Sequence, residues 1–203
     1  MDQAKEAVMQ AFQWLIESIP HLDQIIVGGD SAGGNLALQF LNSVKHDKII
    51  ASFLISPWLD LSLSYPSQKA MENFTHDVLT YSILSAWADA TVGIEPGNQH
   101  SLAQEDVKKH PKYSPFYEQK IKVLPKPLFL YGQEEMFADS IDMYVSRLSQ
   151  LQQVYVIKQS DMPHDYVLIG KSFVFGKIAE KSRQGIDLIA QHMYQASKEA
   201  HQV

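Results

Sequence analysis

Short apolar runs rich in β-branched residues alternate with helical patterns, and this alternation restricts the fold of the chain more than any other feature. Four runs have the composition of buried strands: 24–29, 49–56, 127–132 and 154–158. Helical apolar spacing covers 2–19 and returns in two later sets: Leu36, Ala37, Phe40, Leu41 and Val44, then Ile141, Tyr144, Val145, Leu148 and Leu151. Strands that alternate with helices predict an α/β fold with a mostly parallel sheet and flanking helices.

The stretch from about 59 to 125 interrupts this alternation, because it is too long for a plain crossover between two strands. We expect one crossover helix near 78–92 and an excursion that lines a pocket. Ordinary core packing is an equally good explanation for the aromatic residues in and beside this stretch: Trp58, Tyr65, Tyr81 and Trp87. Both interpretations stay open on the sequence alone.

Composition limits the classes of function. The 203 residues, 45% of them apolar, can bury a core and fit one domain, 1–203. A net charge of −6 that is spread along the chain argues against a nucleic-acid-binding surface. The chain contains no cysteine, which excludes disulfides, thiolate metal sites and a cysteine nucleophile. We also expect no membrane segment in the chain as given, because its longest apolar runs are too short to span a bilayer.

The stretch "IIVGGDSAGGNLALQF" places a serine between the first strand and the next helix. The pattern G-x-S-x-G is satisfied there by Gly29, Asp30, Ser31, Ala32 and Gly33. Such a sharp turn strains the serine backbone, so the positions two residues before and after it must be small. The helix start directs the N–H of Ala32 toward negative charge that develops beside Ser31. Ser31 is therefore a predicted nucleophile with Ala32 as an oxyanion donor, while simple capping of the helix by Ser31 remains the alternative.

A nucleophilic serine in this architecture needs a base that follows it in the chain, with an acid between the two. His164 lies just beyond the last predicted strand, in a turn made by Met162 and Pro163, and is the predicted base. His76 is the other histidine in an unusual setting, but it precedes Asp77 at an expected helix start, where capping explains the pair.

Three carboxylates follow the third predicted strand and could orient the base: Glu134, Glu135 and Asp139. We prefer Glu135, because it falls on the loop just past Gly132, whereas Asp139 lies where the next helix begins and is more simply a cap. The carboxylate of Glu135 should then lie within roughly 3.5 Å of a ring nitrogen of His164.

Together these motifs resemble the hormone-sensitive-lipase-like branch of the α/β-hydrolase fold, which includes arylacetamide deacetylases and fungal steryl acetyl hydrolases. The resemblance covers nearly the whole chain and is carried by "GGDSAGGNLAL", "SPWLDLS", "YSPFY", "YGQEEMFADS" and "MPHDYVL". It implies that Ser31 is the nucleophile, His164 the base and Glu135 the acid, at a position where the family usually has Asp. It also implies that Asp139 steadies the local turn. The implied reaction is hydrolysis of a small-molecule ester through an acyl-enzyme, without a metal or organic cofactor.

The chain departs from this family upstream of Ser31. Family members carry a His-Gly-Gly motif whose N–H groups supply most of the oxyanion hole, and residues 1–24 contain nothing similar. The resemblance therefore implies the C-terminal portion of a hydrolase, with four of the usual eight strands and without the N-terminal ones. Either the chain is a serine ester hydrolase, or it is an impaired fragment that binds a ligand or partner. The first strand would then form a sheet edge, which favours self-association.

Overall fold

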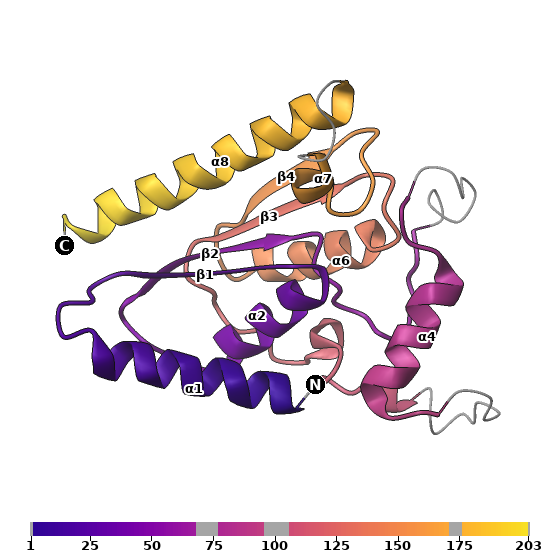
Figure 1. The fold of residues 1–203 in the computed structure, drawn as a ribbon, viewed down its shortest axis with the longest axis horizontal. Coiled ribbons are helices and arrows are strands. Elements are labelled where there is room, and N and C mark those ends of the chain that lie inside the picture. The colour runs from indigo at the N-terminus through magenta and orange to yellow at the C-terminus, as the bar shows by residue number, and fades with distance from the viewer. Residues whose placement is uncertain (1, 68–76, 96–105, 171–175, 203) are drawn as a thin grey trace.

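A four-stranded sheet forms the centre of the computed structural model, which describes residues 2–67, 77–95, 106–170 and 176–202 (Figure 1). The strands are β1 (Ile25–Asp30), β2 (Ile49–Ile55), β3 (Pro127–Gly132) and β4 (Tyr155–Gln159). They pair in the order β1-β2-β3-β4, and every pair is parallel. The predicted α/β class and parallel sheet are confirmed, and the four strands lie where the apolar runs place them.

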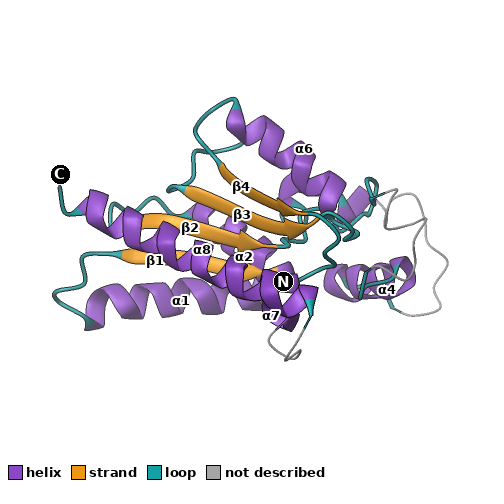
Figure 2. Ribbon diagram, turned by 90° about the horizontal axis from the view of Figure 1, so that it is seen from above, coloured by secondary structure: helices purple, strands orange, loops and turns teal. Residues whose placement is uncertain are grey.

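Helices cover both faces of the sheet (Figures 1 and 2). On one side lie α1 (Asp2–Ser18), α2 (Ser31–Ser43) and α6 (Ala138–Ser149), with α1 packed against α2. On the other side lie the short α7 (Tyr166–Ile169) and the long α8 (Lys177–Ala200). Among the described residues, no helix has both the length and the hydrophobicity to cross a bilayer.

The interior strand β3 separates two apolar cores. Its side chains at Phe129 and Tyr131 pack in the larger core, with residues of α2 and α6. Its side chains at Leu128 and Leu130 pack in the smaller core, beneath α7 and α8. Burial on both faces explains why the strand reads as a continuous apolar run and not as an alternation of apolar and polar residues. The loop that follows β3 is therefore anchored on a strand that is buried throughout, and the loop that follows β2 on a strand that is mostly buried.

The excursion between β2 and β3 contains α4 (Tyr81–Val92) and the short 3₁₀ helix η1 (Pro115–Tyr117). The helix α4 begins later than the expected position 78, because Thr80 is its N-cap and accepts a hydrogen bond from the N–H of Ile83. The predicted crossover helix is therefore present, with a shorter N-terminal end.

The aromatic residues of this region separate into two groups. Trp58 is buried and stacks on Phe137, with 5.6 Å between ring centroids, so it belongs to the core. Trp87 keeps 53% of its surface exposed, and Tyr65 and Tyr81 each keep 43%. Core packing therefore explains Trp58, and Tyr65 contacts the core through Phe116, with 5.2 Å between ring centroids. The exposure of Tyr81 and Trp87 is not explained by core packing.

Candidate active site

The parallel arrangement of the sheet brings the carboxyl ends of all four strands to one edge. Ser31 follows β1, Ser56 follows β2, Glu135 lies on the loop after β3, and His164 lies on the loop after β4. Residues that are more than a hundred positions apart in the chain therefore meet, as is usual for ligand sites of open α/β sheets.

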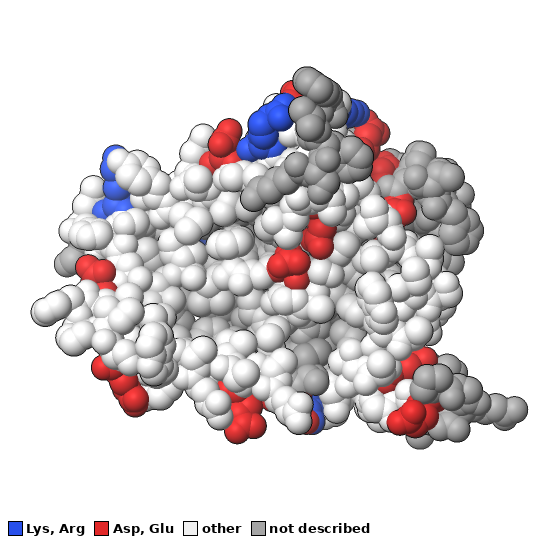
Figure 3. Space-filling view, in the orientation of Figure 1, with Lys and Arg blue, Asp and Glu red and all other residues white. Residues whose placement is uncertain are grey.

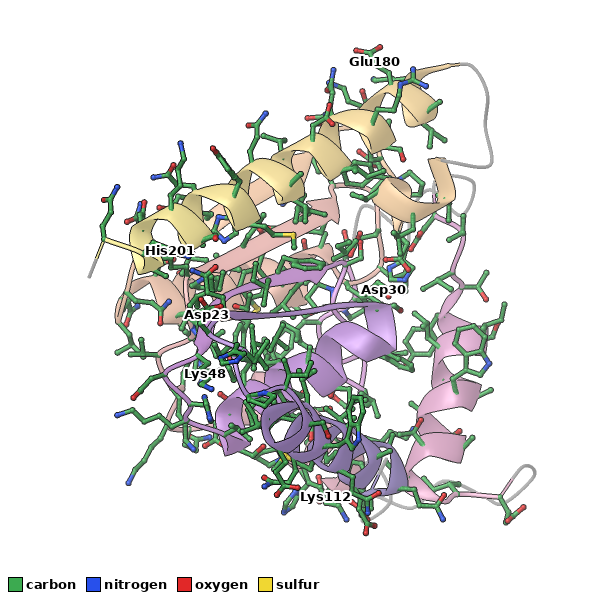
Figure 4. The ribbon with its side chains drawn as sticks, turned by 60° about the vertical axis from the view of Figure 1, so that its left-hand side comes forward. Asp23, Asp30, Lys48, Lys112, Glu180 and His201 are labelled. Atoms are coloured by element: carbon green, nitrogen blue, oxygen red, sulfur yellow. The ribbon has the colours of Figure 1, made fainter. Side chains whose placement is uncertain are left out.

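Ser31 occupies the bend where β1 runs directly into α2. Its φ of 50° lies in the left-handed region that residues with a side chain rarely adopt. The N-cap of α2 is Asp30, at the end of β1 away from Asp23 (Figure 4), and its side chain makes no capping hydrogen bond. The Oγ of Ser31 lies 2.9 Å from Nε2 of His164. The alternative that Ser31 caps the helix is therefore wrong.

The glycines around Ser31 do not all serve the same purpose. A Cβ at Gly29 would overlap the carbonyl group of Gly33, and a Cβ at Gly34 would lie 2.8 Å from the Cβ of Pro57. A Cβ at Gly33 would meet only Oδ1 of Asp30, at an ordinary 3.9 Å. The steric demand for glycine therefore falls on Gly29 and Gly34, and the expectation that Gly33 must be small to clear its neighbours is wrong among the described residues.

Glu135 is completely buried at the end of β3. Its Oε2 accepts hydrogen bonds from the hydroxyl of Ser56 at 2.7 Å and from the N–H of Gly132 at 2.9 Å. Its Oε1 lies 3.9 Å from Nδ1 of His164, longer than the expected limit of roughly 3.5 Å, and contacts of this kind often tighten only when substrate binds. Burial raises the pKa of Glu135, while His164, Ser56 and the N–H of Gly132 act to lower it.

The two other candidate carboxylates have different surroundings. Glu134 is buried, and its backbone N–H donates to the carbonyl of Met162 at 3.1 Å, which joins the loop after β3 to the loop after β4. Asp139 lies in the first turn of α6, whose N-cap is Phe137. The expectation that Asp139 caps this helix is therefore wrong, although a carboxylate in the first turn is favoured by the helix dipole.

His164 lies between two carboxylates. The residue is 4% exposed, and its ring packs edge-on against Phe137, with 5.0 Å between centroids. Besides Ser31, its Nε2 has Oδ2 of Asp165 at 3.1 Å. Burial by itself lowers the pKa of His164, but Asp165 and Glu135 outweigh burial and raise that pKa to about 10. The two carboxylates therefore favour the cationic form of the imidazole.

Sequence analysis did not assign a role to Ser56 or Asp165. Ser56 has a φ of 42°, is completely buried, donates to Glu135 and accepts the backbone N–H of Asp165 at 3.1 Å. The only sequence signal for Ser56 is its place at the start of "SPWLDLS", directly after a strand. Within the described ranges, no group of three or more His, Asp or Glu residues is arranged to hold a metal ion.

Asp77 was expected to cap the helix of the excursion, and this expectation is wrong because Thr80 is the cap. The two oxygens of the Asp77 carboxylate instead accept the backbone N–H of Met136 at 2.8 Å and the backbone N–H of His164 at 2.9 Å. The neighbouring His76 lies outside the described residues.

Comparisons with known proteins agree on the family. Residues 1–168 match the family described as alpha/beta hydrolase fold. An esterase of Acinetobacter venetianus is 30% identical over 151 residues, which cover 73% of this chain and 46% of that protein. A Schizosaccharomyces pombe protein, named for a proposed steryl acetyl hydrolase activity, is 31% identical over 143 residues, or 63% of this chain and 35% of that protein.

Solved structures show the same relationship. A hormone-sensitive lipase from a metagenome library has a TM-score of 0.70 and 25% identity, over 92% of this chain and 59% of that one. An esterase of the bacterial hormone-sensitive lipase family has a TM-score of 0.73 and 22% identity, over 97% of this chain and 60% of that one. The chain therefore spans less than half of each of these curated relatives and about three fifths of the solved ones. It belongs to the α/β-hydrolase-fold family, in the branch that resembles hormone-sensitive lipase.

Proposed function

We propose that the chain carries the catalytic residues of a serine ester hydrolase, with Ser31 as nucleophile, His164 as base and Glu135 as the acid. The 2.9 Å approach of Oγ to Nε2, at a serine on a strained strand-to-helix bend, is the observation that carries this proposal. In its neutral form His164 takes the hydroxyl proton while Oγ attacks the acyl carbonyl, and it then returns that proton to the leaving alcohol. In the second half of the reaction, water attacks the acyl-enzyme while His164 takes its proton. His164 then returns that proton to Oγ of Ser31, and the carboxylic acid is released. Glu135 stabilises the imidazolium formed in each step.

The N–H of Ala32 stabilises the oxyanion of the tetrahedral intermediate. Ala32 is the second residue of α2, where helix N–H groups have no acceptor within the helix, and it is exposed. The positive end of the helix dipole adds to this stabilisation.

The substrate is a small-molecule carboxylic ester, as the names of the esterase relatives suggest. We place the acyl group beside the excursion over 59–125, within the single partial hydrolase domain 1–203. Three apolar side chains of α4 support this placement, because 42 to 53% of their surface is exposed: Tyr81, Ile83 and Trp87. No metal or organic cofactor takes part in this reaction.

A second candidate is an impaired hydrolase that binds a ligand or partner. It is favoured by the absence of a His-Gly-Gly motif from residues 1–24, which leaves Ala32 as the donor identified beside Ser31. Loss of one oxyanion donor typically lowers turnover by about 10²–10³-fold. A polypeptide extended by upstream sequence should therefore turn over short-chain esters faster than the 203-residue chain, and equal rates would argue against this candidate.

Self-association through β1 is a further part of the proposal. This strand ends the described sheet, and an edge strand offers N–H and C=O groups to another chain. In Figure 3, few charged side chains lie between α8 and α1, where Figure 1 places β1. We expect a concentration-dependent dimer in sedimentation velocity, with slower amide exchange over 25–30 as the dimer forms. A monomer at all concentrations would contradict this expectation.

Labelling by a fluorophosphonate tests the catalytic assignment. The probe should attach to Ser31, as located by mass spectrometry of the labelled peptide, and both Ser31→Ala and His164→Ala should abolish the reaction. Because phosphonylation needs an activated serine, loss of labelling in His164→Ala would show that His164 activates Ser31. Equal labelling of Ser31→Ala, or attachment to another serine, would refute the assignment.

A further inference from the structure

We infer that Asp77 is a positioning residue, whose carboxylate holds the acid loop and the base loop at the separation that proton transfer requires. One oxygen accepts the backbone N–H of Met136, the residue after Glu135, and the other accepts the backbone N–H of His164 itself. The inference rests on the proposed roles of Glu135 and His164. It assigns a function to a third carboxylate, which acts through the backbone of the acid loop and of the base loop.

Each of the two bonds fixes a different loop. The loop after β3 carries Glu135, and the loop after β4 carries His164, so the distance between Oε1 and Nδ1 depends on how these loops are spaced. A carboxylate that accepts one N–H from each loop restrains this spacing directly. Bonds from N–H groups to an ionised acceptor are about twice as strong as bonds between neutral groups.

The two loops share one other backbone contact, but that contact does not by itself fix the separation of the acid and the base. The two loops are also joined by the N–H of Glu134, which donates to the carbonyl of Met162 at 3.1 Å. That bond lies on residues before Glu135 and before His164. Asp77 accepts hydrogen bonds from Met136, which follows Glu135 in the chain, and from His164 itself. It therefore restrains the two loops at a second point, beyond the contact of Glu134 with Met162. Without it, rotation of either loop about the first contact would change the 3.9 Å separation of Glu135 and His164.

Asp77 also connects the excursion to the acid loop. The carbonyl of Met136 accepts the N–H of Ser67 at 3.0 Å, so both backbone groups of Met136 are bonded to the excursion. Asp77 lies shortly before α4, whose exposed apolar residues we place beside the acyl group. A shift of α4 on substrate binding would therefore be transmitted to Glu135 and His164 through this carboxylate.

The test compares Asp77→Asn and Asp77→Ala with Asp23→Asn, a control at an exposed aspartate located away from the Asp30 end of β1 (Figure 4). In Asp77→Asn, an NH₂ group replaces one acceptor oxygen. One of the two backbone N–H groups then faces another donor and loses its hydrogen bond. We expect labelling of Ser31 by fluorophosphonate to slow by about 10- to 100-fold, because small misplacements of catalytic groups have effects of this size. The rate of Asp23→Asn should equal that of the unmodified chain.

A second measurement separates positioning from a general loss of stability. The ring nitrogen resonances of His164, assigned with His164→Gln, should shift in Asp77→Asn and Asp77→Ala while the melting temperature of at least one of these variants stays near that of the control. Unchanged resonances, or a rate loss that only follows the unfolded fraction, would overturn the inference. If Ser31 is not labelled even in the unmodified chain, the proposed function fails, while the His164 resonances still decide the role of Asp77.

Discussion

The two ring nitrogens of His164 have surroundings that are built in opposite ways. At Nδ1, Glu135 is completely buried and its Oε2 is held by the hydroxyl of Ser56. At Nε2, Ser31 is only half-buried, lies on a strained bend, and shares the nitrogen with Asp165. The comparison teaches that buried hydrogen bonds orient the carboxylate of Glu135 on the acid side, whereas backbone geometry orients the hydroxyl of Ser31 on the serine side. Four substitutions test this contrast.

The largest effect should come from the acid side. In Glu135→Gln, a neutral amide can no longer stabilise the imidazolium of His164 and favours the wrong tautomer, so hydrolysis of a short-chain ester and labelling of Ser31 should fall by about 10³–10⁴-fold. Glu135→Asp, which introduces the residue that is usual in the family, should keep more activity than the amide variant. A Glu135→Gln rate within tenfold of the unmodified chain would show that another group orients the base.

On the serine side, a substitution that disturbs the backbone of the bend should lower the rate. A methyl group in Gly29→Ala overlaps the carbonyl of Gly33, so the bend must open and Ser31 must move, with an expected rate loss of about 10²-fold. Gly33→Ala is the matched control, because its added Cβ has no neighbour closer than 3.9 Å. Labelling rates and melting temperatures of the two variants make the comparison. Equal losses in both would show that the bend does not depend on this close approach.

Ser56 tests the hydrogen bonds that hold the acid. Ser56→Ala removes the donor to Glu135 and the acceptor of the Asp165 N–H, and it leaves buried polar groups without these partners. We expect a loss of about 1–3 kcal/mol in the free energy of unfolding and a smaller rate loss than for Gly29→Ala. Ser64→Ala, at an exposed serine in the following segment, should change neither quantity. A fully stable Ser56→Ala would mean that the acid is held without this hydroxyl.

Much of the fold and part of the site could be predicted because they depend on local patterns. Each strand is an apolar run, and Ser31, Glu135 and His164 each follow such a run. No helix is predicted from the sequence at α8, whose larger apolar residues on the smaller core are only partly buried: Ile178, Ile186 and Ile189. Its fully buried positions hold small residues: Ala179, Ser182, Gly185 and Ala196.

The roles of Ser56 and Asp77 could not be predicted, for a different physical reason. Ser56 bonds to Glu135, 79 positions away in the chain, and Asp77 bonds to His164, 87 positions away. Contacts of this kind depend on how loops meet in space and leave no periodic signal in the sequence. Short polar side chains are also common as local caps, which is why Asp77 was expected to be one. The contacts of Ser56 and Asp77 can be identified only from the folded structure, in which the parallel sheet brings the loops after its strands together.

The smallest effect on the maximal rate, and the clearest on pH dependence, should come from Asp165→Asn. His164 accepts the serine proton only in its neutral form, so labelling of Ser31 should rise with pH through the pKa of His164, which the carboxylates raise to about 10. Removing the charge of Asp165 lowers that pKa, so the midpoint should move to lower pH and labelling near pH 7 should rise severalfold, with little change in the alkaline plateau. Glu135 still lies beside Nδ1 and also acts to raise the pKa of His164, so the midpoint should stay above the ordinary histidine value of about 6.5. Asp161→Asn, at an aspartate with 66% of its side chain exposed in the same loop, is the control and should leave the profile unchanged. A midpoint in Asp165→Asn that stays in place or moves to higher pH would show that the serine side of the imidazole is not governed by this carboxylate.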